Sequence, residues 1–225
     1  MKTPLTRARL KRHLTYSGWK YALLAVLCVF GWNLYFTVTA YRPPEDKKLT
    51  VYLYAYGDRA GLESWLEDTR RAGYPEQELF EVMQLTPDDT NGVVVLSTHL
   101  FSGEGDIIVL PRDQFYTYAR DGFFIPLERS LPGLADALDA AGINADKGWR
   151  LLRDPETDEM TEERHLYGLP VSALPIVNSA VLSSTEYFAG IRVSCGNEET
   201  ALSVLKEICL TNPDIRTAWD GDEKT

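Results

Sequence analysis

Hydrophobic and polar positions divide the chain into a long apolar run near its start and a longer region of short, periodic segments. Residues 21–41 contain no charged side chain. As an α-helix they would extend about 31 Å, which matches the hydrocarbon core of a bilayer. From residue 49 onward, short apolar stretches alternate with amphipathic stretches of helical period. The pattern predicts one membrane-spanning helix followed by a domain of mixed α and β structure.

The clearest unit of the second region is the stretch 105–127. Residues 106–110 are apolar and rich in β-branched side chains, which predicts a strand buried on both faces. Pro111 is expected to end this strand, because proline has no N–H to donate within a sheet. The helix that follows should close at Gly122, a residue suited to a left-handed C-cap. Residues 123–127 then predict a second short buried strand.

The remaining segments show the same two periods. Strands are predicted at 49–54, 79–85, 167–172 and 187–194, helices at 62–72, 131–141 and 197–208, and a hairpin at 148–153 and 161–166. Asn197 is expected to cap the last of these helices. Residues 86–102 fit either class, and we favour a helix because two parallel strands need a crossover between them. The fold class is therefore predicted as α/β, with a mainly parallel sheet flanked by helices.

Charge follows the same division. Seven of the 23 Lys and Arg residues lie in residues 1–42, which contain no Asp or Glu, so the remaining 16 stand against 33 acidic residues, a net charge of −17. Positive charge that precedes an apolar span stays in the cytoplasm. We predict a cytoplasmic N-terminus at 1–20, a transmembrane signal anchor at 21–41, a linker at 42–48, an extracytoplasmic domain at 49–210 and a polar, frayed tail at 211–225.

A cleaved signal peptide is the alternative for the apolar run. Val38, Thr39 and Ala40 have the character of a cleavage site after Ala40. The run is longer than a usual signal-peptide core, however, and it contains Trp32 and Tyr35. An uncleaved anchor, which makes the chain a single-pass protein of the cell membrane, is therefore favoured.

Composition narrows the function classes. So acidic an exported domain repels phosphate backbones, and nucleic acid is not an expected partner. Cys28, Cys195 and Cys209 do not have the spacing of a disulfide framework, and the three histidines have no metal-ligand spacing. Nothing in the sequence brings a histidine to a cysteine or serine, as nucleophilic catalysis requires. We expect no enzymatic activity and no cofactor.

Ligands of parallel sheets collect beyond the carboxyl ends of the strands. That rule indicates six candidate ligand-binding side chains: Tyr54, Tyr56, Asp58, Arg112, Asp113 and Tyr167. Tyr54, Tyr56 and Asp58 could stack on and hydrogen-bond a sugar or similar polar solute. Arg112 and Asp113 could bind an anion or a polar group, and Tyr167 could line a cleft. Each has a structural alternative, since tyrosines also cover sheets, Asp58 could start a turn, and Asp113 could cap a helix while Arg112 stays in solvent.

The acidic run 154–163 raises a calcium hypothesis, because its first, third and fifth residues are acidic as in an EF-hand loop. Glu159 stands where that loop needs glycine, and His165 stands where it needs glutamate. A solvated hairpin tip is the favoured interpretation, and no metal site is predicted.

Three short motifs follow one another in the second region. They are G-D-I-I-V-L at 105–110 with D-G-F-F-I-P-L at 121–127, Y-G-L-P at 167–170, and N-E-E-T-A at 197–201. In order and spacing they resemble the extracellular solute-binding proteins of bacterial ABC importers. The resemblance implies a type II periplasmic-binding lobe, a small polar solute as ligand, and a transporter or sensor as partner.

The chain departs from that family in one respect. Family members build a whole second lobe after the strand that carries the Y-G-x-P motif. Here only residues 171–186 separate this strand from the return strand, which leaves room for a loop or one short helix. We therefore expect a one-lobe relative that presents or senses a solute. The alternative is a non-catalytic interaction module of the cell envelope, in which the surface that a second lobe would cover contacts another protein.

Overall fold

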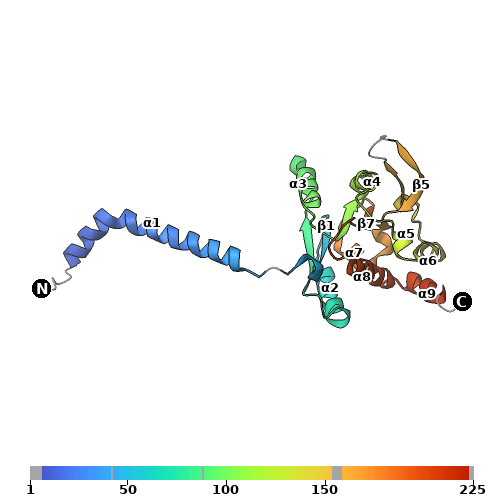
Figure 1. Ribbon diagram of the computed structural model, residues 1–225, viewed down its shortest axis with the longest axis horizontal. Coiled ribbons are helices and arrows are strands. Elements are labelled where there is room, and N and C mark those ends of the chain that lie inside the picture. Colours follow the sequence, from blue (N-terminus) through green and yellow to red (C-terminus); the bar gives the residue numbers. More distant parts are fainter. Residues whose placement is uncertain (1–6, 42, 88, 154–158, 223–225) are drawn as a thin grey trace. The chain divides into compact units, whose positions relative to one another are not determined.

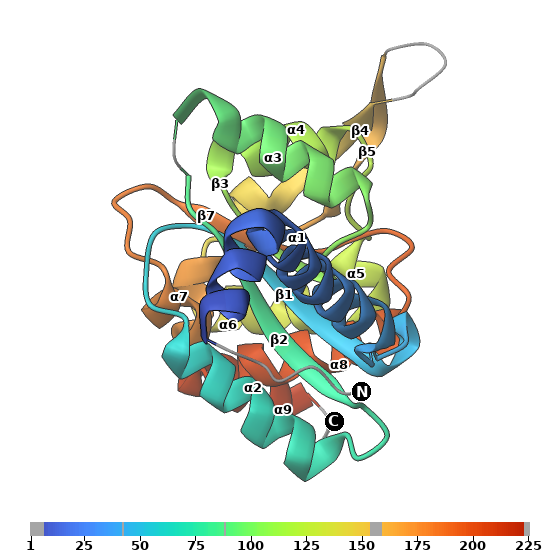
Figure 2. The same ribbon diagram turned by 90° about the vertical axis from the view of Figure 1, so that its left-hand side faces the viewer.

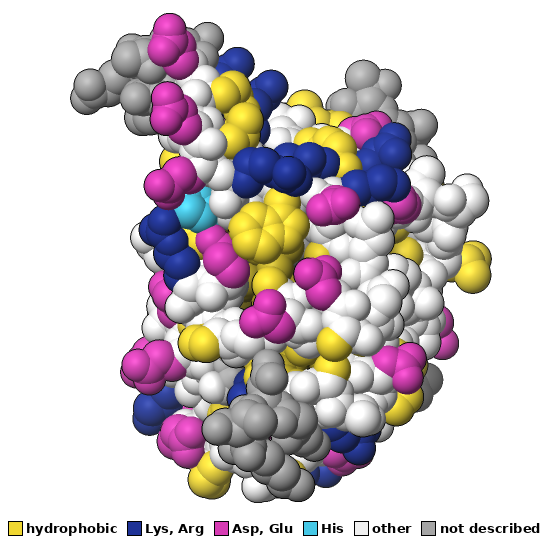
Figure 3. Space-filling view, turned by 90° about the vertical axis from the view of Figure 1, so that its right-hand side faces the viewer, with side chains coloured by type: hydrophobic (Ala, Val, Ile, Leu, Met, Phe, Trp, Pro, Cys, Tyr) yellow, Lys and Arg dark blue, Asp and Glu magenta, His cyan; other side chains and the backbone are white. Residues whose placement is uncertain are grey.

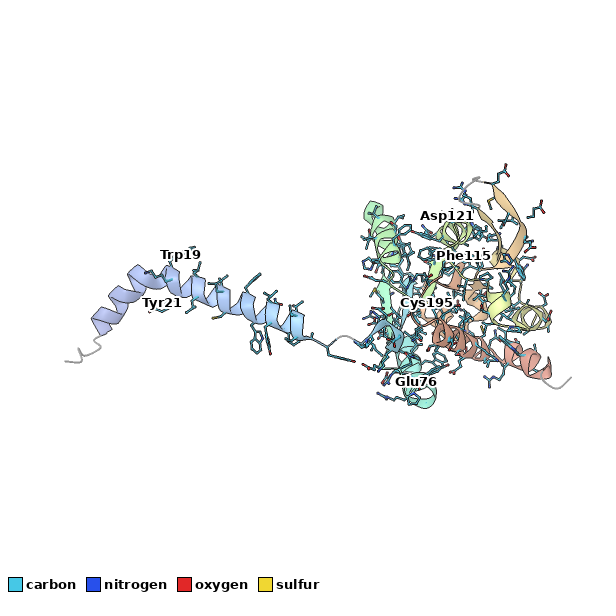
Figure 4. The ribbon with its side chains drawn as sticks, in the orientation of Figure 1. Trp19, Tyr21, Glu76, Phe115, Asp121 and Cys195 are labelled. Carbon is cyan, nitrogen blue, oxygen red and sulfur yellow. The ribbon has the colours of Figure 1, made fainter. Side chains whose placement is uncertain are left out.

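The computed structural model of the protein contains two compact units, Met1–Arg42 and Pro43–Thr225 (Figure 1). It describes residues 7–41, 43–87, 89–153 and 159–222. In the first unit, α1 (Arg7–Thr39) is one helix of 33 residues. Its segment Gly18–Thr39 has the length and composition of a membrane-crossing helix, features that a signal sequence shares, and none of it is buried in protein. Trp19 and Tyr21 project from this helix in Figure 4.

The second unit is built on a five-stranded sheet of order β2-β1-β3-β7-β6. Its strands are β1 (Lys48–Tyr54), β2 (Leu79–Leu85), β3 (Ile107–Pro111), β6 (Leu169–Pro170) and β7 (Tyr187–Ile191). β1 pairs in parallel with β2 and β3, whereas β7 pairs antiparallel with β3 and β6. Four strands thus run in one direction and β7 runs in the other, which confirms the mainly parallel sheet.

Helices cover both faces of this sheet (Figure 2). The larger core includes side chains of α2 (Ala60–Gly73), α6 (Leu134–Ala140), α7 (Pro175–Ala180), α8 (Glu198–Leu210) and α9 (Pro213–Asp222). The smaller core includes side chains of α3 (Asp89–Phe101) and α4 (Arg112–Arg120) on the other face. β1 divides between them with a period of two, since Leu49, Val51 and Leu53 enter the larger core and Tyr52 and Tyr54 the smaller one.

The stretch 105–127 positions α4 on the smaller core. Phe115 of α4 is fully buried and stacks on Phe188 of β7, with ring centroids 4.8 Å apart. Gly122 follows the helix with a φ of +75°, the left-handed conformation predicted for it. Residues 123–127 do not form the predicted strand. Phe124 makes a single bridge to Arg192, and α5 (Leu127–Ser130) begins directly after Pro126, which has no N–H to continue a strand.

A separate two-stranded sheet carries the predicted hairpin, formed by β4 (Trp149–Arg153) and β5 (Met160–Leu166). β4 lies against α4, where the Arg150 guanidinium stands 3.5 Å from the centroid of the Tyr116 ring. Residues 154–158, on which the calcium hypothesis depends, lie outside the described residues.

Three other predictions are settled by the structure. The helix favoured within 86–102 is confirmed as α3. The strand predicted at 167–172 is shorter, because β6 passes into a 3₁₀ turn at Val171–Ala173. The tail predicted from residue 211 instead contains α9, which inserts Ile215 and Trp219 into the larger core. Two apolar residues four positions apart in a polar stretch are a weak signal for an amphipathic helix. The prediction of a frayed tail was wrong for that reason.

Candidate functional site

The carboxyl ends of β1, β3 and β6 lie at one edge of the sheet, where the antiparallel β7 begins. Pro111 at the end of β3 pairs with Tyr187, and Pro170 at the end of β6 pairs with Phe188. Residues 171–186 connect β6 to β7 at this edge. They contain a 3₁₀ turn and the short helix α7, which agrees with the loop or short helix expected for them. The connection therefore lies where open α/β sheets bind ligands.

A hollow of about 520 Å³ opens beside this connection. Its polar lining comes from the connection and from the loop before β4, and consists of Asn144, Lys147, Ser172, Asn178, Ser183, Ser184, Thr185 and Glu186. A second hollow of about 390 Å³ shares four of these residues and adds Pro111, Arg112 and Asp113. We call the two hollows together the edge groove. Small-molecule sites typically measure roughly 300–1,000 Å³, so the edge groove has a suitable size.

Glu186 is the electrostatic centre of the edge groove. Its Oε1 accepts a hydrogen bond from Lys147 Nζ at 2.5 Å, and its Oε2 lies 3.5 Å from Arg112 Nη1. The hydrogen bond from Lys147 and the positive charges of both neighbours lower the pKa of the Glu186 carboxyl. Arg112 Nε also lies 3.5 Å from Asp113 Oδ1. Two cations and two carboxylates are therefore arranged along one wall.

The rest of the edge groove presents neutral hydrogen-bonding groups. The Ser183 and Thr185 hydroxyls lie 2.9 Å apart, and the Thr185 N–H donates to Ser183 Oγ at 3.1 Å. Asn178 and Ser184 are exposed. Hydroxyl and amide side chains both donate and accept hydrogen bonds, as do the hydroxyls of a sugar or polyol. The lining is chemically matched to a small, polar, hydroxylated molecule.

Two of the six predicted site residues line the edge groove, namely Arg112 and Asp113. Asp113 is not the helix cap suggested as its alternative. The N-cap of α4 is Pro111, the helix has no side-chain cap, and the Asp113 side chain is 85% exposed in the first turn. Because a carboxylate there faces the helix N-terminus, its charge is still favourable for α4.

Tyr56 and Asp58 lie just beyond the carboxyl end of β1 but do not line the edge groove. Tyr56 is about half exposed, and its hydroxyl donates a hydrogen bond to the Pro87 carbonyl. Asp58 Oδ1 accepts a hydrogen bond from the Ala60 N–H at 2.9 Å. Asp58 therefore starts the turn into α2, as its structural alternative proposed.

Tyr54 and Tyr167 are packed in the smaller core, each only 3% exposed. Burial raises the pKa of both phenols. Packing in the core explains why tyrosines occupy these two positions, and no role in ligand binding is needed. Contact between any of the six predicted residues and a solute stays a prediction, and the geometry favours Arg112 and Asp113 for it.

Sequence reasoning missed the residues that dominate the edge groove, above all Lys147, Asn178, Thr185 and Glu186. Glu186 directly precedes a predicted strand, and residues at the start of a parallel strand lie at the edge away from the ligand. β7 is antiparallel, so its start lies at the carboxyl edge of its neighbours. The missing signal was the direction of this one strand, which its side-chain pattern does not encode.

Cysteine and metal chemistry have no support in the part of the chain that the structure describes. No group of three or more His, Cys, Asp or Glu side chains among those residues could hold a metal ion. Burial raises the pKa of Cys195 to about 11 and that of Cys209 to about 12. Both side chains are therefore protonated thiols at neutral pH, not nucleophilic thiolates.

No family model matches the sequence, and no curated protein matches it. Solved structures do show similarity. An extracellular solute-binding protein of family 1 from Alicyclobacillus acidocaldarius is 16% identical, with a TM-score of 0.38, over 57% of this chain and 29% of that protein. A cyclo/maltodextrin-binding protein complexed with maltotetraose is 20% identical, with a TM-score of 0.36, over 59% of this chain and 29% of that protein.

A third structure is an ABC transporter solute-binding protein from Agrobacterium vitis with bound D-mannitol. It is 17% identical, with a TM-score of 0.33, over 55% of this chain and 26% of that protein. The chain is thus similar over part of its length to extracellular solute-binding proteins, and it spans less than a third of the length of these three.

Proposed function

We propose that this chain is a membrane-anchored, non-catalytic, extracytoplasmic domain that binds a small polar solute, sugar-like in its chemistry, in the edge groove. It either presents this solute to a transporter or senses it on behalf of a sensor protein. The observation that carries the proposal is the edge groove itself, where amide, hydroxyl and paired charged side chains converge from segments far apart in sequence. The motifs at 105–127, 167–170 and 197–201 support the same class of function.

The anchoring half of the proposal is supported by α1. Its apolar segment Gly18–Thr39 is long enough to cross a bilayer. Six of the seven Lys and Arg residues in 1–42 precede residue 21, which favours a cytoplasmic N-terminus. N-terminal sequencing of the mature protein tests it, because an uncleaved anchor retains residue 1 and a signal peptide would leave a new terminus after Ala40.

A one-lobe site limits affinity. Small-molecule pockets usually bury roughly 70–90% of the ligand surface. A single lobe covers a solute from one side only, so part of the apolar and hydrogen-bonding surface of the solute stays in water. We therefore expect a dissociation constant nearer to about 1 mM than to about 1 nM.

The test is thermal unfolding of the full-length chain in uncharged detergent, against sugars, oligosaccharides, polyols and amino acids. A ligand at 100 times its dissociation constant should stabilise the native state by about 2.7 kcal/mol, which is visible as a rise in Tm. Because weak binding is expected, each solute is titrated to high millimolar concentration. A dose-dependent rise with one chemical class is the expected result.

Lys147→Ala should abolish that rise, because it removes the partner that orders Glu186. Lys47→Ala is a matched control, since the two lysines have nearly equal exposure (50% and 49%) and each pairs with a glutamate, Glu186 or Glu78. Lys47 precedes β1 and does not line the edge groove. An unchanged response in Lys147→Ala, or an equal loss in both variants, would remove the edge groove as the binding site.

A specific observation favours the second candidate function, a protein-interaction module. Leu182 is 77% exposed and Tyr56 is 48% exposed. The Leu182 N–H donates to the Tyr56 carbonyl, so two exposed residues with large apolar side chains are neighbours at the carboxyl edge. A flat response to every solute, together with chemical crosslinks to a membrane partner that Leu182→Asp removes, would favour this function over solute binding.

A further inference from the structure

A separate hollow of about 420 Å³ lies between α4 and the β4–β5 hairpin. It is lined by Tyr116, Thr117, Arg120, Trp149, Arg150, Leu151, Met160 and Arg164, and it shares no residue with the edge groove. We call it the arginine pocket. Three arginines in one hollow stand out in a unit of net charge −17. Figure 3 shows Lys and Arg side chains gathered beside hydrophobic ones near the hairpin.

Contacts with neutral groups hold two of these arginines in place. The Arg150 guanidinium stacks on the Tyr116 ring, and its Nη1 donates to the Trp149 carbonyl at 3.2 Å. Arg164 Nη2 donates to the carbonyls of Asp146 and Trp149 at 3.2 and 3.3 Å. These contacts fix both guanidinium groups, and none of them comes from a carboxylate.

The lining of the arginine pocket contains no Asp or Glu in the part of the chain that the structure describes. Among the described residues, no carboxylate forms an ion pair with Arg150 or Arg164, and Arg120 has only Asp121, at 3.6 Å. The Nε atom of Arg150 is buried and has no hydrogen-bond partner within the described ranges. Neighbouring cations that repel one another, together with one unused buried donor, cost free energy of folding. An anion bound in the pocket would offset both costs.

We infer that the arginine pocket binds the phosphate group of a small organophosphate, such as a sugar or polyol phosphate. The planar guanidinium fork matches phosphate oxygens in geometry. A phosphate monoester offers three terminal oxygens and a charge of about −1.5 to −2 at neutral pH, enough for arginines that approach from three elements. A carboxylate offers only two oxygens and one charge. Trp149, Leu151 and Met160 supply the apolar wall for the organic part.

This site does not depend on solute binding in the edge groove, and its test keeps the two apart. Isothermal titration calorimetry of the full-length chain in uncharged detergent would use glucose 6-phosphate, glycerol 3-phosphate and inorganic phosphate, with glucose as the uncharged comparison. At least one organophosphate should bind, more tightly than inorganic phosphate, with affinity that falls as salt rises. No binding of any phosphate compound, or binding of glucose with equal affinity, would overturn the inference.

The variants are Arg150→Gln and Arg164→Gln, each expected to weaken organophosphate binding about tenfold or more, because each removes a charged hydrogen bond to the anion. Arg71→Gln on α2 is the control, since Arg71 is 66% exposed and pairs with Glu67 away from the pocket. Arg150 and Arg164 also donate hydrogen bonds to backbone carbonyls, so their loss could destabilise the fold. Circular dichroism and Tm must therefore show that each variant is folded.

If either glutamine variant fails to fold, Arg164→Lys replaces it. This variant keeps the charge and a donor but loses the planar fork, and an intermediate loss of affinity is expected. Folded variants that bind the organophosphate as tightly as the wild type would remove the arginines from the site and overturn the proposal. Lys147→Ala should leave organophosphate binding unchanged, because Lys147 does not line the arginine pocket.

Discussion

At the residue scale, Asp106 shows how a motif residue can serve the sheet. It is 7% exposed, and its Oδ2 accepts a hydrogen bond from the Thr50 N–H at 2.8 Å. Its own N–H donates to the Thr50 carbonyl at 2.8 Å, so the residue ties β1 to the segment that leads into β3. Burial raises the pKa of the Asp106 carboxyl, although the bond from Thr50 and the charge of Arg192 oppose the rise.

The raised pKa gives a pH prediction with a definite sign. Above the ordinary aspartate value of about 3.9 and up to the raised native value, the folded state holds the proton more tightly than the unfolded state. The stability from this group is therefore present at low pH and is lost as pH rises through the native pKa. Asp106→Asn stays neutral and keeps an acceptor for the Thr50 N–H. Its free energy of unfolding, relative to wild type, should increase from about pH 4 to about pH 7.

Urea unfolding of both proteins at the two pH values measures this difference. Asp113→Asn is the control, because the Asp113 side chain is 85% exposed and its substitution should give a smaller change with pH. A relative stability of Asp106→Asn that is constant or falls toward neutral pH would show that burial does not control this carboxyl.

At the element scale, α9 is the helix that the sequence pattern did not predict. Ile215 is fully buried and Trp219 is 7% exposed, and Lys206 of α8 lies over the Trp219 ring at 5.0 Å. α9 also packs against α6, which places the last helix on the larger core of the sheet. The helix is therefore part of the folded unit.

Ile215→Ala should lower the free energy of unfolding by about 2–5 kcal/mol, because it removes buried methyl groups from a closed core. Thr217→Ala, at an exposed site on the same helix, should change it by no more than about 0.5 kcal/mol. Guanidinium unfolding followed by tryptophan fluorescence measures both. Equal effects of the two substitutions would mean that α9 does not share the core.

Elements with strong periodicity were predictable from the sequence, and those defined by tertiary contacts were not. β1, β2 and the hairpin follow from side-chain period and turn chemistry alone, whereas α3 needed the further argument that parallel strands require a crossover. The structure places all four within a few residues of the predicted bounds. The strand expected at 123–127 failed because apolar composition does not reveal a partner strand. The sequence predicts ligand contacts beyond the carboxyl ends of the strands, and the edge groove lies at that edge. Its lining residues depend on the direction of β7 and on contacts between distant segments, which the sequence pattern does not show.

At the scale of the whole molecule, the two units differ in what stabilises them. Both hydrophobic cores lie entirely within Pro43–Thr225, whereas the apolar segment of α1 has no buried surface among the described residues. Long-range contacts of the sheet and its helices therefore belong to one unit. If α1 is the proposed anchor, a bilayer or detergent covers its apolar surface.

Residues 43–225 expressed alone should fold and unfold cooperatively in plain buffer. Their Tm should lie within a few degrees of the value for the full-length chain in uncharged detergent, because no core contact is lost. Differential scanning calorimetry of both samples makes the comparison. A large drop in Tm, or loss of cooperativity, would show that α1 contributes to the stability of the domain.

The short connection between β6 and β7 has a kinetic consequence for the proposed function. A binding protein with two hinged lobes traps its ligand by closing. A receptor can then recognise the ligand-bound state by its closed conformation. Residues 171–186 are the only link between those strands, and the described residues form no second lobe that could close over the ligand. Residence times should be brief, and loading should leave the backbone nearly unaltered. A receptor for this domain would then have to touch the captured molecule directly, because no change of shape would report that it had arrived.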